Sequence, residues 1–315
     1  MPIVTLKEIL ADAHKQHYGV GMFDVHNLEM TNAVIQAAEE LRSPVIIALA
    51  EVHADTVRTL EDISNIMVYA AKRAKVPVCV HLDHGGHLET CIRVMHYGFS
   101  SVMFDGSMLP YEENIRRTAE VVRMASIFGA SVEAELGHVG GAEGGGEDGH
   151  QVAYTDPEQA QDFVKQTGVD ALAVSIGTAH GVYKEKPKLD LNRLRAIRAK
   201  VDVPLVLHGG SGLSDLDFRN CIQGGIAKVN IYTELVQRAV SRISCEVAAP
   251  HSESCRTCGA PQNQQELVEW LTAIVQPMLT GQGAIPYPDL MRQSMDGMKQ
   301  TVSERIKLFG SAGKV

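Results

Sequence analysis

Three histidines stand in or directly after separate apolar runs of the sequence. His84 ends VPVCVHLDH, His180 follows DALAVSIG, and His208 ends VPLVLH. Three neutral imidazoles that leave one coordination position open are a donor set of catalytic zinc sites, and carboxylates behind them orient the rings. The chain has 13 His, most of which we interpret as surface or core residues. The sequence predicts a metal site only because these three belong to strand ends.

Further polar side chains end neighbouring apolar runs. Asp83 closes the third run, Asp105 the fourth, Glu133 and Glu135 the fifth, and Asn230 the eighth. Carboxylates can move protons between carbon and oxygen atoms of a substrate. We therefore expect acid–base groups beside the metal, although Asp105 fits equally well as a helix N-cap.

Two short segments predict an anion site. HGGSG at 208–212 and NIYT at 230–233 each follow an apolar run and precede a helical segment. Backbone N–H groups at a helix N-terminus bind phosphate, and in barrels the loops after strands seven and eight commonly do so. Lys184, in HGVYK, is a candidate further cation. A metal beside a phosphate site favours chemistry through an enediolate, with the metal acting on a ketone oxygen.

Short apolar runs alternate with segments of helical periodicity through most of the chain. The runs are nearly continuous in apolar residues, as is typical of parallel strands buried on both faces. Eight such strand–helix units predict an α/β fold, a (β/α)8 TIM barrel, with an open doubly wound sheet as the alternative. In both folds the polar strand ends meet at one edge. The expected strands are 19–25, 44–50, 76–84, 101–106, 131–137, 170–177, 203–209 and 226–232.

Two segments interrupt this alternation. Residues 137–149 contain seven glycines, so we interpret 137–153 as an active-site loop that closes over the substrate, with a disordered insertion as the alternative. Residues 245–315 begin with a polar, turn-rich stretch. We interpret them as a C-terminal helical extension of one barrel domain spanning 1–315.

Helical periodicity within that extension covers 263–279 and 289–307. The extension also holds Cys255 and Cys258, a lone CxxC pair that has no second ligand pair and is expected to be an ordinary loop. These cysteines are therefore not predicted to form a metal or redox site.

Composition narrows the class of partner. The chain has 315 residues with 29 Lys+Arg against 38 Asp+Glu, a formal charge of −9, which argues against nucleic acid as the main partner. No apolar run approaches the ~18 residues of a membrane helix. Charged residues interrupt the N-terminal segment, so it does not read as a secretory signal, and we expect a cytoplasmic protein.

Five motifs, in this order, resemble the class II zinc-dependent ketose-bisphosphate aldolases, in particular their tagatose/fructose-bisphosphate branch: HLDHGG, VEAELGHVGGAE, GTAHGVYK, LHGGSGL and KVNIYTEL. The similarity covers about 18–240 and resumes at MRQSMDGMK and IKLFGSAGK. The resemblance implies a (β/α)8 barrel in a homodimer or homotetramer of carbohydrate metabolism. It also implies reversible cleavage of a ketose bisphosphate or ketose 1-phosphate, through a zinc-stabilised enediolate, to dihydroxyacetone phosphate and an aldehyde.

The resemblance assigns the metal ligands. It implies that His84, His180 and His208 bind Zn²⁺, that Glu135 is an alternative or nearby ligand, and that Asp105 belongs to the metal region.

It also assigns the groups around the substrate. Asp83 would protonate the aldehyde oxygen in condensation, Glu143 would move the proton at the dihydroxyacetone phosphate carbon, and Asn230 would help to hold the enediolate. The phosphate on carbon one would bind to Gly181, Gly209, Gly210, Ser211 and Thr233, with Na⁺ or K⁺ nearby.

The sequence departs from the family pattern at four places. Asp24 replaces the usual Asn, Ala48-Leu49-Ala50-Glu51 replaces a small hydroxyl or Gly-Thr end, and Tyr232 replaces the Asp of fructose-bisphosphate enzymes. Pro288 aligns with an Arg that reaches across a dimer to the distal phosphate. Without that guanidinium the distal phosphate loses its bidentate cation, so a ketose with an unphosphorylated far end is an alternative substrate.

Two other functions stay open at this stage. One is a non-catalytic barrel subunit that stabilises a partner aldolase, although such a subunit has no need for the histidines and Asp83 together. The other is a different zinc lyase or epimerase that uses the same enediolate chemistry.

Overall fold

Eight parallel strands form a closed barrel in the computed structural model, which describes residues 3–54, 59–141, 153–181, 187–248 and 287–315. Strand order follows the chain, and pairing of Met22 with Asn230 joins the first strand to the last. This closure confirms the predicted TIM barrel and excludes the open sheet. The strands are β1 Val20–Asp24, β2 Val45–Ala50, β3 Val78–Gly85, β4 Ser101–Phe104, β5 Ser131–Leu136, β6 Ala171–Val174, β7 Leu205–Leu207 and β8 Ile226–Ile231.

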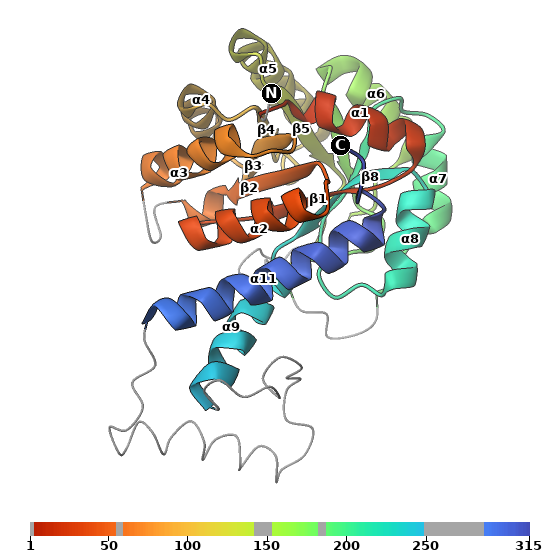
Figure 1. Ribbon diagram of the computed structural model, residues 1–315. Helices are drawn as coiled ribbons and strands as arrows, with labels where there is room; N and C mark the ends of the chain where they lie inside the picture. The colour runs from red at the N-terminus through yellow and green to blue at the C-terminus, as the bar shows by residue number, and fades with distance from the viewer. Residues whose placement is uncertain (1–2, 55–58, 142–152, 182–186, 249–286) are drawn as a thin grey trace.

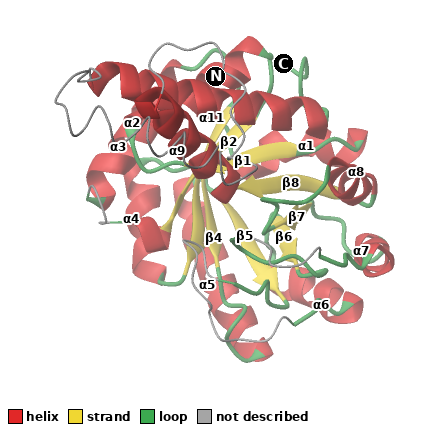
Figure 2. Ribbon diagram, turned by 90° about the horizontal axis from the view of Figure 1, so that it is seen from below, coloured by secondary structure: helices red, strands yellow, loops and turns green. Residues whose placement is uncertain are grey.

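Helices surround the strands, as Figure 2 shows. Many begin at residues whose side chains accept a hydrogen bond from the first turn, such as Asn27, Thr59 and Asp156, because such caps satisfy otherwise unpaired N–H groups. The helices that follow the strands are α2 Leu28–Glu40, the 3₁₀ turn η1 Glu51–His53, α3 Leu60–Arg73, α4 Leu88–Tyr97, α5 Tyr111–Phe128, α6 Pro157–Thr167, α7 Leu191–Arg198, α8 Asp215–Gln223 and α9 Thr233–Ala248.

Sequence analysis missed the first helix, α1 Leu6–Gln16. Thr5 and Glu8 form a capping box at its start, which is a recognisable signal in the sequence. The helix lies across the N-terminal end of the barrel and buries Leu6 and Leu10 against the interior at that end. This end of the barrel is therefore closed by apolar packing.

The barrel interior changes character along its axis. Near α1 it is filled by small and apolar side chains such as Met22, Ile46 and Cys79. One layer further on, the fully buried side chains are His81, Glu133 and Lys228, with exposures of 0%. The polar layer lies below the carboxyl ends of the strands, where the predicted site residues meet.

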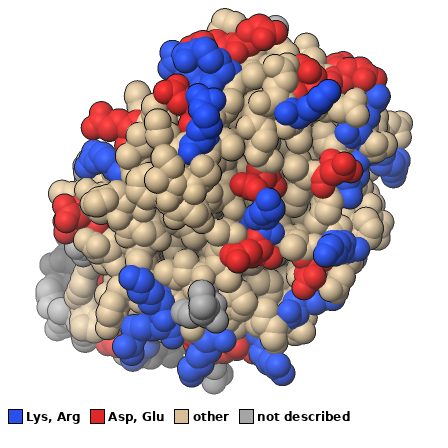
Figure 3. All heavy atoms as spheres, turned by 90° about the horizontal axis from the view of Figure 1, so that it is seen from above, with Lys and Arg blue, Asp and Glu red and all other residues tan. Residues whose placement is uncertain are grey.

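The last helix, α11 Tyr287–Phe309, confirms the helical segment expected at 289–307. It packs against α2 and α9 and ends beside the start of β1, where Gly19 N–H donates to Phe309 O at 2.9 Å. The helix predicted at 263–279 and the cysteines 255 and 258 lie outside the described residues. Among the residues described, no helix combines the length and apolar character needed to cross a bilayer. On the face seen in Figure 3, Lys and Arg are interspersed with Asp and Glu.

Candidate active site

The three predicted histidines converge at the carboxyl ends of the strands. His84 lies in β3, His208 directly follows β7, and His180 lies in the loop after β6, which ends at Val174. One ring nitrogen of each lies within 4.8 Å of those of the other two, and His84 Nε2 is 2.9 Å from His208 Nδ1. Residues separated by up to 124 positions thus present their ring nitrogens to one small volume.

Carboxylates on the far side of two rings determine which nitrogen faces this volume. Asp105 Oδ2 lies 2.7 Å from His84 Nδ1, and Glu133 Oε1 lies 2.9 Å from His208 Nε2. Because a carboxylate accepts hydrogen bonds, these two nitrogens carry the ring hydrogens. The lone pairs of His84 Nε2 and His208 Nδ1 then point toward each other.

This arrangement fits a metal cation. Two neutral lone pairs held 2.9 Å apart repel each other unless a cation or proton lies between them. Ligand nitrogens about 2.0–2.1 Å from a tetrahedral zinc are about 3.4 Å from one another, so the His84–His208 pair at 2.9 Å would open by about 0.5 Å on binding zinc. The donor set and its orientation therefore match the predicted Zn²⁺ site.

Glu135 and Asp105 lie beside the histidines but in different electrostatic environments. Ligand atoms of His84, Asp105 and Glu135 also lie within 4.8 Å of one another. Burial raises the pKa of Asp105, but hydrogen bonds from His84 and Ser107 outweigh it and hold that pKa well below its usual range. Burial and the negative charge of Asp105 raise the pKa of Glu135 to about 8. Asp105 is thus an ionised partner of His84, and Glu135 is a carboxyl group that a nearby cation would ionise.

A buried ion pair below the histidines was missed by sequence analysis. Lys228 Nζ lies 2.8 Å from Glu133 Oε2, and both side chains are fully buried. Sequence analysis placed Glu133 at a strand end among the expected acid–base groups but named no partner for it, and it did not single out Lys228 in β8. The lysine compensates the charge of the carboxylate that orients His208.

Asp83 and Asn230 lie on the side of the site opposite the Asp105 carboxylate. Asn230 Nδ2 donates to Asp83 Oδ1 at 3.1 Å, and Asp83 Oδ2 lies 3.8 Å from His84 Nε2. Asp83 is completely buried and Asn230 is 5% exposed. The amide fixes one carboxylate oxygen and leaves the other directed at the place where the imidazoles meet.

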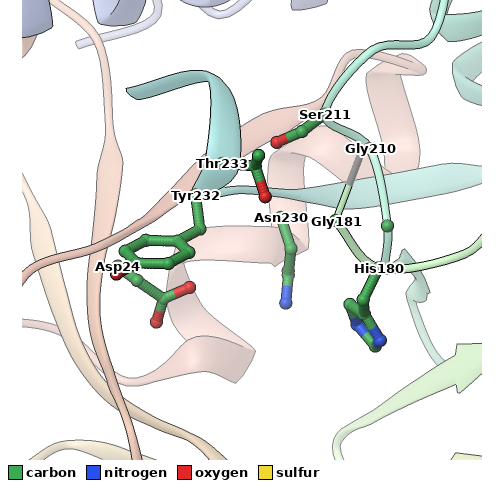
Figure 4. Close-up of a pocket in the computed structure, with 9 residues that line it drawn as sticks. Asp24, His180, Gly181, Gly210, Ser211, Asn230, Tyr232 and Thr233 are labelled. Atoms are coloured by element: carbon green, nitrogen blue, oxygen red, sulfur yellow. The ribbon is translucent and has the colours of Figure 1, made fainter. Parts of the chain in front are cut away.

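Glycines and hydroxyls form a cradle on one wall of the adjoining pocket. Gly209 has φ +64°, and a Cβ at this residue would lie 2.4 Å from Ala179 O. Figure 4 shows the hydroxyls of Ser211 and Thr233 on the same side of the pocket, with Gly181 nearby. Thr233 is also the first residue of α9. Backbone N–H groups of a glycine loop and a helix start suit phosphate.

The opposite wall carries two of the departures from the family pattern. Asp24 and Tyr232 line the same pocket, and Asn230 lies between Asp24 and His180 (Figure 4). The rings of His53 and Tyr232 are 4.8 Å apart, and His26 lies 5.7 Å from His53. Sequence analysis did not single out His26, although it directly follows the first apolar run, or His53.

Two predicted site residues, Glu143 and Lys184, lie outside the described part of the chain, as does most of the glycine-rich loop 137–153. The other predicted residues all lie around the histidines or the pocket: Asp83, His84, Asp105, Glu135, His180, Gly181, His208, Gly209, Gly210, Ser211, Asn230 and Thr233.

Known proteins are similar to this chain over nearly its whole length. A family model described as "Fructose-bisphosphate aldolase class-II" matches residues 4–314. The chain is 40% identical over 303 residues to the "Uncharacterized protein YdjI" of Escherichia coli K12, covering 96% of each. The crystal structure of that YdjI aldolase has a TM-score of 0.80 at 38% identity and 99% coverage of both chains.

Relatives with named activities differ in substrate. The chain is 39% identical over 316 residues to "6-phospho-5-dehydro-2-deoxy-D-gluconate aldolase" of Shouchella clausii, covering 100% of this chain and 97% of the relative. It is 44% identical over 239 residues to "D-tagatose-1,6-bisphosphate aldolase subunit GatY" of Klebsiella oxytoca, covering 75% and 83%. The motifs, the barrel and these matches agree: the chain belongs to the class II fructose-bisphosphate aldolase family and is an aldolase, a carbon–carbon lyase.

Proposed function

We propose that this aldolase reversibly cleaves a ketose phosphorylated on carbon one, either a bisphosphate or a 1-phosphate, into dihydroxyacetone phosphate and an aldehyde. The observation that carries the proposal is the cluster of three imidazoles beside a pocket with a glycine cradle. A metal site next to a phosphate site fits a substrate whose ketone is one carbon away from its phosphate.

His84, His180 and His208 would hold Zn²⁺, and Glu135 is suited to be an additional ligand. Bound there, Zn²⁺ would act as a Lewis acid on the ketone oxygen and stabilise the charge of an enediolate. Asp105 and Glu133 keep the rings of His84 and His208 in the tautomers that this requires.

Asp83 and Asn230 are placed to handle the carbon–carbon bond. In cleavage, Asp83 Oδ2 takes the proton of the hydroxyl on carbon four, the bond between carbons three and four breaks, and its electron pair stays with the dihydroxyacetone phosphate half. Asn230 holds Asp83 Oδ1 at 3.1 Å during this transfer. Glu143 would then return a proton to carbon three, as the family resemblance implies.

Gly181, Gly209, Gly210, Ser211 and Thr233 would bind the phosphate on carbon one, with Lys184 as a further cation. Their support is the placement of the described members around one pocket. A Na⁺ or K⁺ ion near the phosphate, the homodimer or homotetramer and the cytoplasmic location stay predictions.

Deuterium exchange into dihydroxyacetone phosphate tests the proposal without knowledge of the aldehyde. We expect zinc-loaded protein to exchange one carbon-three proton in NMR spectra, and chelated protein to lose this exchange. Absence of exchange from folded, metal-loaded protein would contradict catalysis and favour a non-catalytic subunit. Exchange without cleavage of any ketose phosphate would instead favour an epimerase or another lyase.

A further inference from the structure

The wall of the pocket opposite the cradle is built from the ends of two paired strands. Phe23 of β1 pairs with Ile231 of β8, so Asp24 and Tyr232 follow at adjacent positions of the barrel rim. Both line the pocket, and Asp24 is only 1% exposed. In Figure 4 the carboxylate of Asp24 lies beside the Tyr232 ring. A carboxylate and a phenol therefore share one wall.

Two imidazoles extend this wall. The ring of His53, from the turn after β2, is 4.8 Å from that of Tyr232, and the ring of His26 is 6.2 Å from it. Burial lowers the pKa of His26, and burial and His26 together lower the pKa of His53. Both rings are neutral at pH 7, so each offers one hydrogen-bond donor and one acceptor.

Distance from the cradle decides which half of a substrate meets this wall. In Figure 4, Asp24 lies on one side of Asn230, and His180 and Gly181 lie on the other. A ketose that places its carbon-one phosphate in the cradle and its ketone near His180 directs its remaining carbons toward Asp24 and Tyr232. These carbons become the aldehyde product.

We propose that Asp24, Tyr232 and His53 form the binding subsite for the aldehyde half, and that this subsite takes an uncharged, polyhydroxylated chain rather than a phosphorylated one. The proposal rests on the proposed function and specifies its substrate class. A carboxylate accepts hydrogen bonds from sugar hydroxyls but repels a phosphate, while a phenol and neutral imidazoles bind hydroxyls as donors and acceptors. The pocket-lining residues that the structure describes contribute no Lys or Arg side chain.

The first test compares two substrates that differ only in the distal phosphate. We expect the zinc-loaded full chain to cleave fructose 1-phosphate with a kcat/KM at least about ten-fold above that for fructose 1,6-bisphosphate. If the bisphosphate is cleaved equally well or better, the inference is wrong while the aldolase function stands. Loss of deuterium exchange into dihydroxyacetone phosphate would instead overturn the proposed function itself.

The second test assigns the discrimination to the Asp24 carboxylate. Asp24→Asn keeps the shape and removes the charge, so we expect the ratio of the two kcat/KM values to fall about ten-fold toward parity. A merely structural defect would lower both values together and leave their ratio unchanged, which would overturn the role of Asp24. Asp12→Asn, on the exposed face of α1, removes the same charge elsewhere and should keep the wild-type ratio. Dihydroxyacetone phosphate exchange by each variant confirms that its metal and phosphate sites are assembled.

Discussion

Lys228 and Glu133 form an ion pair that has no exposed side-chain surface, with Nζ and Oε2 2.8 Å apart. The second oxygen of Glu133 lies 2.9 Å from Nε2 of His208. A buried carboxylate needs charge compensation, since isolated charges are costly in a low-dielectric interior. The lysine therefore supplies the charge compensation that Glu133 needs while its other oxygen orients the ring of His208.

Lys228→Met is expected to weaken zinc binding about 10–100-fold, in the range typical of changes behind metal ligands. Removing one partner of a buried ion pair is also expected to lower the free energy of unfolding by about 3–5 kcal/mol. Chelator competition measures the first effect and urea unfolding of the apoprotein the second. Lys200→Met is the matched control because Lys200 pairs with Glu158 at 2.6 Å on the surface. Wild-type zinc affinity in Lys228→Met would show that the ion pair serves stability alone.

Asp83→Asn is expected to lower kcat for cleavage about 10²–10⁴-fold, the usual contribution of a general base. An amide can still accept the hydrogen bond from Asn230, but it cannot take the proton of a substrate hydroxyl. Deuterium exchange into dihydroxyacetone phosphate involves no such hydroxyl, so it should fall far less than cleavage. Equal losses in the two assays would mean that Asp83 acts on binding of the ketose phosphate and not on bond cleavage.

Gly209→Ala is expected to raise the KM for dihydroxyacetone phosphate at least about ten-fold in the exchange assay. The new Cβ would lie 2.4 Å from Ala179 O, so the cradle has to move. Gly129→Ala is a matched control at the end of α5: its φ is +69°, but no atom lies within 4 Å of the added Cβ. The control should lose about 1–2 kcal/mol of stability from the left-handed backbone, with an unchanged KM. A wild-type KM in Gly209→Ala would remove this loop from the phosphate site.

His14 links stability to pH at the opposite end of the barrel. Burial and the charge of Arg198 lower the pKa of His14, whose Nε2 lies 2.9 Å from Arg198 Nη2. Its pKa is lower in the folded than in the unfolded chain, so the stabilisation is present above pH ~6.5 and is lost as pH falls below that value. We expect His14→Gln to reduce the fall in Tm between pH 7.5 and 5.5. Measurements on chelated protein keep metal release out of the comparison.

The exposed His96 of α4 provides the control for that experiment, since His96→Gln should leave the pH dependence of Tm as in wild type. The same slope for His14→Gln and wild type would show that other buried histidines, such as His81, account for the acid sensitivity.

The barrel could be predicted from sequence because its strands are buried on both faces and its helices have a clear period. The expected strand 44–50, for example, contains β2 Val45–Ala50. Helix α1 was missed because the prediction started from continuous apolar runs, and the apolar residues of this helix are separated by polar ones. Its Thr5–Glu8 capping box was the signal that could have identified it. The helix expected at 289–307 extends two residues further at each end in α11 Tyr287–Phe309, because helix ends depend on local capping.

The candidate site was predictable where chemistry coincides with strand ends. His84, His180 and His208 met because parallel strands place their carboxyl ends at one rim. Lys228 could not be assigned because its role depends on which side chain lies across the barrel, and sequence order does not contain that pairing. Likewise, the contact of His53 with Tyr232 depends on a turn after β2 folding over β8.

The packing of α11 on α2 affects how the protein is made. The C-terminal segment completes the first βα unit through Gly19, Ser43 and Leu41, which bond to Phe309, Ser311 and Gly313. During synthesis on the ribosome, β1 cannot pair with β8, and α2 cannot pack against α11, until these later segments have been made. At ~5–20 residues per second this leaves apolar surface uncovered for tens of seconds. We therefore expect nascent chains to depend on chaperones until the last helix emerges, and truncation before α11 to cause aggregation during synthesis.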